Sequence, residues 1–193
     1  MFDWFSFLSY TFVTAVTPGP NTLSAMSVGG RLGFRRGLPF NLGIWLGFSV
    51  VMLLCTFLCS SLEALIPRIR LPMLILGAAY MLYLAWGTYK SAPLTEKEGV
   101  GGSFLSGLWL QFVNVKIYIY GIMSMEAYVL PYFHGRPGVL ALFALLLAFI
   151  GFVFTLLWSL FGSVFRSLFS KHGKITNTVL ALMLVYCALS LFL

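Results

Sequence analysis

A proline-rich interruption lies within the first long apolar stretch of the chain, where the sequence reads Thr17-Pro18-Gly19-Pro20-Asn21. Because proline has no backbone N–H, Pro18 and Pro20 deprive the carbonyls of Thr14 and Val16 of their helical donors. A helix that begins near Pro20 presents free N–H groups and the positive end of its dipole. The interruption therefore offers donors to a carboxylate, and its freed carbonyls, with the hydroxyls of Thr14 and Thr17, offer acceptors to an ammonium group. A zwitterion fits both.

A second polar group lies in a later apolar stretch, which carries Gln111, Asn114 and Lys116. Gln111 and Asn114 share a helical face, and Lys116 adjoins it. A charge near the bilayer centre costs at least ~2.5–3.5 kcal/mol on insertion scales, so we expect Lys116 to face a cavity or a partner. Two roles for Lys116 stay open: pairing with a substrate carboxylate, or carrying a coupling proton. The simpler alternatives are that Lys116 extends to a membrane interface and that Gln111 only bonds a neighbouring helix.

These two groups make up the predicted substrate-binding site. Its residues are Thr17, Pro18, Gly19, Pro20, Asn21, Gln111, Asn114 and Lys116.

The composition is that of an integral membrane protein, whose solvent is the lipid bilayer. Of the 193 residues, 60% are hydrophobic and 9% are charged, whereas about 25% are charged in a typical soluble domain. The net charge of +7 does not indicate nucleic-acid binding, because the basic residues lie in short loops and form no basic face. We expect an all-α fold, a polytopic membrane bundle forming one transporter domain over residues 1–193.

Six apolar stretches are long enough to span a bilayer as helices. Pro39 is expected in the first turn of the second, where proline is favoured. The predicted spans are Trp4–Val28, Pro39–Leu62, Pro72–Tyr89, Phe104–Met125, Val139–Gly162 and Ile175–Leu193.

The basic residues of the loops predict the orientation. Odd-numbered loops carry Arg31, Arg35, Arg36, Lys90, Lys97, Arg166, Lys171 and Lys174, and even-numbered loops carry only Arg68, Arg70 and Arg136. The positive-inside rule places the odd loops in the cytoplasm and both the N- and C-termini on the outer, periplasmic side. Trp158, near the predicted inner end of the fifth span, is interpreted as an interfacial anchor.

The one long polar connection, residues 90–103, divides the spans into two sets of three. Since three is odd, the second set must run through the membrane upside down relative to the first, as in inverted-repeat transporters. We therefore expect repeat one over about 1–90 and repeat two over about 104–193. Gly43 and Gly47 form a small-x-x-x-small pattern, expected to pack within the bundle or, alternatively, to form the interface of a homo-oligomer.

Other chemistries find little support. No P-loop pattern is present, and Cys55, Cys59 and Cys187 are interpreted as small buried hydrophobic residues. We expect no metal, no cofactor and no enzymatic activity, because no nucleophile–base pair, intramembrane carboxylate pair or His-rich set is found. A non-transporting accessory or channel-like subunit remains an alternative class.

The motifs together resemble the LysE/RhtB superfamily of amino-acid exporters. The resemblance covers essentially the whole chain and is carried by the Thr17–Asn21 motif, the basic glycine loop 31–37, the segment 77–84 and Asn114-x-Lys116. The family commonly has proline where Val115 stands, so the sequence leaves open whether the fourth span breaks there.

The resemblance implies a secondary transporter in a bacterial inner membrane, and it also implies that Thr17–Asn21, Asn114 and Lys116 lie at the translocation site. Within the superfamily the chain is similar to the branch that exports cysteine and O-acetylserine. Another neutral amino acid, such as homoserine or threonine, is the alternative substrate, and coupling to protons is left open.

Overall fold

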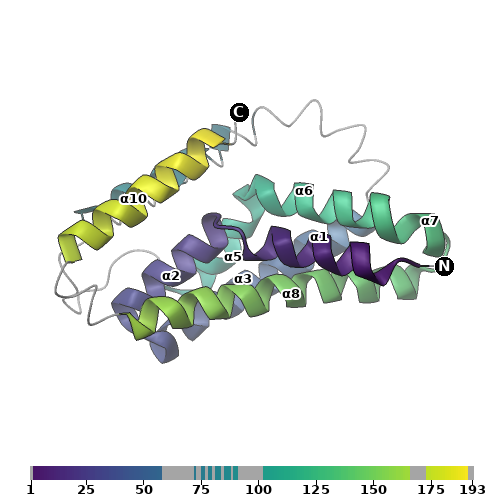
Figure 1. Ribbon diagram of the computed structural model, residues 1–193, viewed down its shortest axis with the longest axis horizontal. Coiled ribbons are helices and arrows are strands. Elements are labelled where there is room, and N and C mark those ends of the chain that lie inside the picture. The colour runs from purple at the N-terminus through teal and green to yellow at the C-terminus, as the bar shows by residue number, and fades with distance from the viewer. Residues whose placement is uncertain are drawn as a thin grey trace.

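The computed structural model describes most of the chain, and every described segment of regular structure is helical (Figure 1). The described residues are 2–57, 72, 75–76, 78–79, 81–83, 85–87, 89–90, 102–165 and 173–190. The helices are α1 (Trp4–Val16), α2 (Pro20–Leu32), α3 (Phe34–Phe57), α5 (Phe104–Val113), α6 (Val115–Ser124), the π-helix η1 (Met125–Val129), α7 (Leu130–Phe133), α8 (Pro137–Val164) and α10 (Gly173–Ser190).

The predicted first span is two helices, as the proline-rich interruption requires. Helix α1 ends at Val16 and α2 begins at Pro20, with Pro20 at the first helical position, where its missing N–H removes no helical bond. Thr17 has ψ 140° and Gly19 has φ −170° and ψ −177°, so both residues are extended.

The fourth span is also interrupted, although Val115 stands where the resembling family has proline. Asn114 (φ −86°, ψ 91°) leaves the helical region and separates α5 from α6. Its side-chain Oδ1 accepts a hydrogen bond from the Lys116 backbone N–H at 3.2 Å. Asparagine caps a helix N-terminus well because its short side chain satisfies one of the orphan donors. The cap thus starts a new helix without proline.

Several predicted boundaries differ from the structure. Helix α3 begins at Phe34, which places Pro39 inside the helix rather than in its first turn. The described residues between 72 and 90 are helical. The loop carrying Arg68 and Arg70, most of the 90–103 connection, and Cys59 lie outside the described residues.

Length and apolar composition mark two of the described helices as able to cross a membrane, α3 and α8. Helices α1 and α5 are apolar but shorter, because each belongs to a span divided by a break. Six complete spans are therefore not established by helix length alone.

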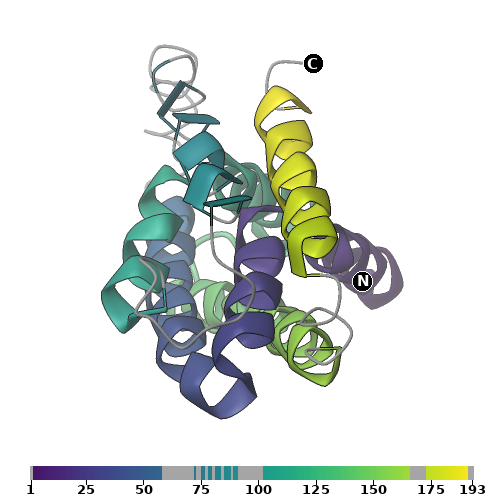
Figure 2. The same ribbon diagram turned by 90° about the vertical axis from the view of Figure 1, so that its left-hand side faces the viewer.

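Glycines bring two pairs of helices into close contact, α2 with α8 and α3 with α5 (Figure 2). A Cβ on Gly29 would overlap the Ser159 carbonyl of α8, and one on Gly43 would overlap the Phe104 carbonyl of α5. A Cβ on Gly47 would lie 2.8 Å from the Gln111 side chain. Gly43 and Gly47 therefore pack within the bundle, as one of the two sequence interpretations expected.

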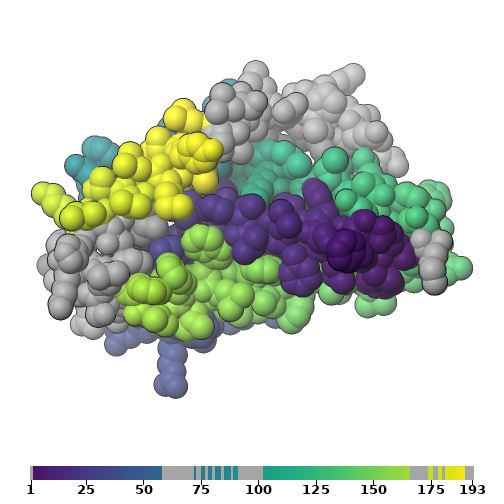
Figure 3. All heavy atoms as spheres, in the orientation of Figure 1, coloured from purple at the N-terminus to yellow at the C-terminus, as the bar shows by residue number. Residues whose placement is uncertain are grey.

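The two halves of the first span contact different neighbours. Helix α1 lies between α6 and α8, and α10 lies against α2 (Figures 1 and 3). Leu23 of α2 belongs to one buried cluster with Met81, Leu184 and Cys187. This arrangement brings Cys187 of α10 and Met81 beside the break.

Candidate functional site

The break in the first span frees several backbone carbonyls, and other groups of the chain bind three of them. The Thr14 carbonyl accepts from the Thr17 hydroxyl at 2.8 Å, and the Val16 carbonyl accepts from the Trp158 indole N–H at 3.3 Å. The Thr17 carbonyl accepts from the Lys116 ammonium at 2.9 Å. Because a bare carbonyl in hydrocarbon costs several kcal/mol, these contacts explain how the break is tolerated.

Lys116 is turned toward the break, not toward a membrane interface. Its Nζ donates to both the carbonyl (2.9 Å) and the hydroxyl (2.8 Å) of Thr17. The aliphatic part of its side chain lies over Gly19, where a Cβ would be 3.1 Å from Cδ and 3.2 Å from Nζ. The extended backbone at Gly19 could be adopted by any residue. A glycine is favoured here because the Lys116 side chain comes too close for a Cβ.

Three amide side chains from the two broken spans form a buried cluster. Asn21 Nδ2 donates to Gln111 Oε1 at 2.8 Å, and Gln111 Nε2 donates back to Asn21 Oδ1 at 3.1 Å. Asn114 Nδ2 donates to the same Asn21 Oδ1 at 2.9 Å. The cluster joins α2, α5 and the second break by hydrogen bonds between side chains.

Gln111 lies behind the other two amides. It is fully buried, and its second Nε2 proton goes to the Gly107 carbonyl at 3.0 Å. It lines neither of the two cavities at the breaks. The structure therefore brings Gln111 to the predicted site but in contact with Asn21, with no open side toward a ligand.

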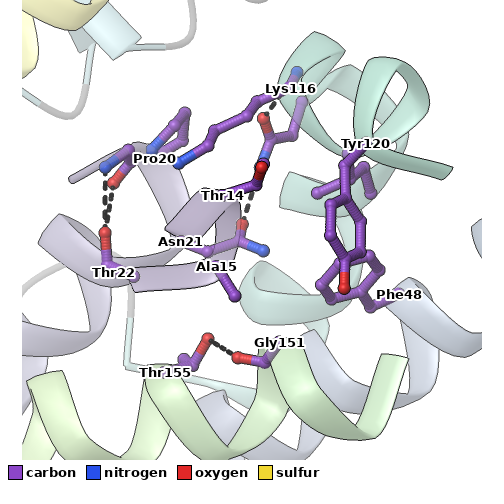
Figure 4. Close-up of a pocket in the computed structure, with 13 residues that line it drawn as sticks. Thr14, Ala15, Pro20, Asn21, Thr22, Phe48, Lys116, Tyr120, Gly151 and Thr155 are labelled. Atoms are coloured by element: carbon purple, nitrogen blue, oxygen red, sulfur yellow. Dashed lines mark hydrogen bonds between the residues drawn. The ribbon is translucent and has the colours of Figure 1, made fainter. Parts of the chain in front are cut away.

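A cavity lined by both polar and apolar residues lies between the two breaks (Figure 4). It encloses about 390 Å³, including the part open to solvent. Lys116 and Asn21 border one side of it, and the rings of Tyr120 and Phe48 stand across from Thr22. Its lining residues are Thr14, Ala15, Gly19, Pro20, Asn21, Thr22, Phe48, Asn114, Lys116, Ile117, Tyr120, Gly151 and Thr155.

A second cavity adjoins the first and shares five lining residues with it, namely Thr14, Gly19, Pro20, Lys116 and Tyr120. It encloses about 720 Å³, again including open space, and extends toward α10 and the 72–90 segment. Thr17 and Pro18 line this second cavity and not the first. Of the other predicted site residues, Asn21 and Asn114 line only the first cavity, and Gly19, Pro20 and Lys116 line both.

Several lining residues were missed by sequence reasoning. Phe48, Tyr120 and Thr155 belong to no sequence motif, and only a polar side chain in an apolar stretch marked Tyr120 and Thr155. Trp158, which lines neither cavity, was predicted to be an interfacial anchor, and the structure adds that its indole N–H donates to the freed Val16 carbonyl. Helix packing, and not a local motif, decides which residues of the apolar spans face the breaks.

Within the described parts of the chain, no group of three His, Cys, Asp or Glu residues could hold a metal ion. Interrupted apolar helices that meet at a cavity with buried polar groups are the arrangement found in secondary transporters. Fold and site thus define a helical membrane transporter.

The chain belongs to the LysE type translocator family, which it matches over residues 12–193. It is 44% identical over 189 residues to a cysteine/O-acetylserine efflux protein of Klebsiella pneumoniae, covering 96% of this chain and 95% of that protein. Proteins of the same description from Salmonella typhi and Escherichia coli are 42% and 40% identical over 190 residues, with 97% of this chain and 96% of each relative covered. No solved structure gives a significant match.

Membership in this family identifies the chain as a multi-pass membrane translocator rather than an enzyme. It agrees with the resemblance stated from the sequence motifs.

Proposed function

We propose that this translocator exports cysteine and O-acetylserine, binding the amino-acid head group in the cavity between the two breaks. The substrates are those named for relatives that are 40% to 44% identical over nearly the whole chain. Both are small, uncharged in the side chain and zwitterionic at neutral pH. The site is the one proposed from sequence: Thr17, Pro18, Gly19, Pro20, Asn21, Asn114 and Lys116, with Gln111 positioning Asn21.

The observation that carries this proposal is the set of hydrogen bonds within the amide cluster. Asn21 Oδ1 already accepts two hydrogen bonds, one from Gln111 and one from Asn114. An amide nitrogen carries two donors, and the described bonds use one on Asn21 and one on Asn114. Asn21 and Asn114 line the first cavity, so each has an N–H left to offer there. Such a pair of donors suits a carboxylate.

Two further groups can donate hydrogen bonds to the substrate carboxylate. The first turn of α2 has backbone N–H groups without intrahelical acceptors, and its dipole favours an anion. The Lys116 ammonium has three protons, of which two are directed to Thr17. The third is available to the carboxylate, which agrees with one of the two roles left open for Lys116.

Other groups at the cavity can bind the substrate ammonium. In a continuous helix the Ala15 carbonyl would accept from the Gly19 N–H, but that N–H donates to the Thr22 hydroxyl at 2.9 Å. The Ala15 carbonyl thus becomes an acceptor at the cavity that Ala15 lines. Tyr120 and Phe48 add aromatic faces, which attract cations within about 6 Å.

For the architecture, we propose a single domain of six spans in two inverted repeats, about 1–90 and 104–193. An interruption in the first helix of each set supports the repeats, at Thr17–Gly19 and at Asn114. We further propose that both termini face the periplasm, on the distribution of Lys and Arg among the loops.

Coupling to protons and a homo-oligomeric state remain predictions. Deprotonating Lys116 would remove a charge beside the freed Thr17 carbonyl, so Lys116 is our proposed carrier if transport consumes a proton gradient. Gly43 and Gly47 pack inside the protomer, so an oligomer interface would have to lie elsewhere.

Uptake of labelled cysteine and O-acetylserine into inverted membrane vesicles tests the function. We expect uptake by the native chain, competition by each substrate against the other, and weaker competition by homoserine and threonine. Asn21→Asp replaces the donor facing the carboxylate with an acceptor, and Lys116→Met removes the ammonium; both variants should insert normally and lose uptake. Lys174→Met, at an exposed position, serves as the control. Preferred uptake of homoserine or threonine would contradict the substrate assignment.

A further inference from the structure

The second cavity differs in chemistry from the first. Besides the residues of the breaks, it is lined by Met81 and Cys187, with Tyr10 and Ile119 from α1 and α6. Met81 is 1% exposed and Cys187 9%, so the two sulfur-bearing side chains form a buried wall. Ile119 is 52% exposed and stands at the open side.

The two cavities meet at residues that we assign to the head group. Lys116, Gly19, Pro20 and Tyr120 line both spaces, as does Thr14. An α-amino acid held there by its carboxylate and ammonium has one further substituent, its side chain. The second cavity is the adjoining space into which that side chain can extend.

We propose that the second cavity is the side-chain subsite, and that Met81, Cys187 and Ile119 select short, uncharged side chains of weak polarity. This assignment rests on the proposed function. Thioether and thiol groups are soft and polarizable and form only weak hydrogen bonds. A thiol or an acetyl ester loses little on leaving water for such a wall, whereas a cationic side chain loses its hydration with no partner of opposite charge among the described lining residues, and an anionic one would compete with the substrate carboxylate for Lys116. Among the described residues that line this cavity, Lys116 is the one charged group.

The subsite makes a prediction about size as well as polarity. One methylene more or less in an apolar pocket changes discrimination by about 10–200-fold. Cys187→Val adds bulk to the buried wall and should reduce uptake of O-acetylserine relative to cysteine by about tenfold. Ile119→Ala opens the exposed side and should improve competition by methionine by about tenfold.

Each variant has a matched control outside the cavity. Cys55→Val makes the same replacement at another buried cysteine, which lies in the core beside Val51 and Met52. Met123→Ala shortens an apolar side chain on the same helix as Ile119, with a similar exposure of 48%. Neither control residue lines the first or the second cavity.

The experiment measures competition in inverted vesicles by alanine, serine, cysteine, O-acetylserine and methionine. Selectivity that shifts in Cys187→Val and Ile119→Ala, but not in their controls, supports the subsite. If Cys187→Val fails to insert, Ile119→Ala decides, because its half-exposed position tolerates truncation. If the native chain takes up the substrates and Ile119→Ala leaves the selectivity unchanged, the proposed subsite is wrong while the proposed function stands. That result would indicate that lipid or water fills the second cavity. A native chain that takes up none of these amino acids overturns the proposed function, and the subsite with it.

Discussion

Replacing Gln111 with methionine tests whether a residue that lines neither cavity at the breaks controls substrate binding. Methionine has nearly the length and volume of glutamine, so packing against Gly47 is retained. The change removes the hydrogen bonds of the Gln111 amide to Asn21 and to the Gly107 carbonyl. We expect Asn21 to lose its fixed orientation, and the apparent KM for transport to rise.

The magnitude follows from counting which groups lose a partner. Asn21 Oδ1 keeps its bond from Asn114, but the Asn21 N–H that pointed at Gln111 loses its acceptor. One buried donor without a partner costs about 1–3 kcal/mol, which sets the expected loss in free energy of unfolding. If Asn21 recovers this by turning its amide, it withdraws the donor from the substrate carboxylate. At 1.4 kcal/mol per tenfold, the KM would rise by about 5–150-fold.

The assay is uptake into inverted vesicles at varied substrate concentration, together with thermal unfolding of the purified protein. A purely structural role would lower stability and leave the KM of the remaining protein unchanged. A double-mutant cycle sharpens the test, because Gln111→Met should cost little once Asn21 is already leucine. Additive effects of the two substitutions, or an unchanged KM with full stability, would refute the reasoning.

Three further predictions follow from single contacts. Trp158→Phe removes the donor to the Val16 carbonyl and should lower the free energy of unfolding by about 1–3 kcal/mol. The control is Trp45→Phe, at a ring stacked on Phe152. Equal losses in the two variants would contradict the assigned contact. Gly19→Ala should insert normally but reduce uptake, because its Cβ would displace the Lys116 side chain; Gly138→Ala, where a Cβ meets nothing within 4 Å, should transport as the native chain does. The pKa of Asp3, which lies before α1, is held below its ordinary value by hydrogen bonds from the Ser6 hydroxyl and backbone N–H. This cap therefore stabilises the start of α1 above the ordinary pKa and is lost as pH falls through the lowered one; amide exchange in the first turn should speed up on acidification, and an unchanged rate would argue against the cap.

The break in the first span could be predicted from sequence because its cause is local. A proline lacks its N–H in any fold, so Pro18 and Pro20 free the same carbonyls whatever surrounds them. The helix starting at Pro20, which has its dipole end at the cavity, follows from the same local chemistry. Membrane character was likewise fixed by composition, since a chain with 9% charged residues lacks the polar surface of a soluble domain.

The break at Asn114 shows where local reasoning becomes insufficient. The sequence left it open, because Val115 has an N–H and permits a continuous helix. The structure interrupts the helix with an asparagine cap, and Asn114 Nδ2 is bonded to Asn21, 93 positions away in the chain. An asparagine can stay within a helix or cap the start of a new one. Here Asn114 caps a new helix, and its side chain is bonded to Asn21 of a distant segment.

What the sequence by itself determined is the class of protein and the presence of polar groups in two apolar spans. Only the tertiary structure decided which group meets which: Lys116 with Thr17, Gln111 with Asn21, and Trp158 with Val16. The physical reason is that residue type fixes how many donors and acceptors a side chain has. The partner that uses each of them is fixed by helix packing, which in this chain depends on glycine contacts between segments far apart in sequence.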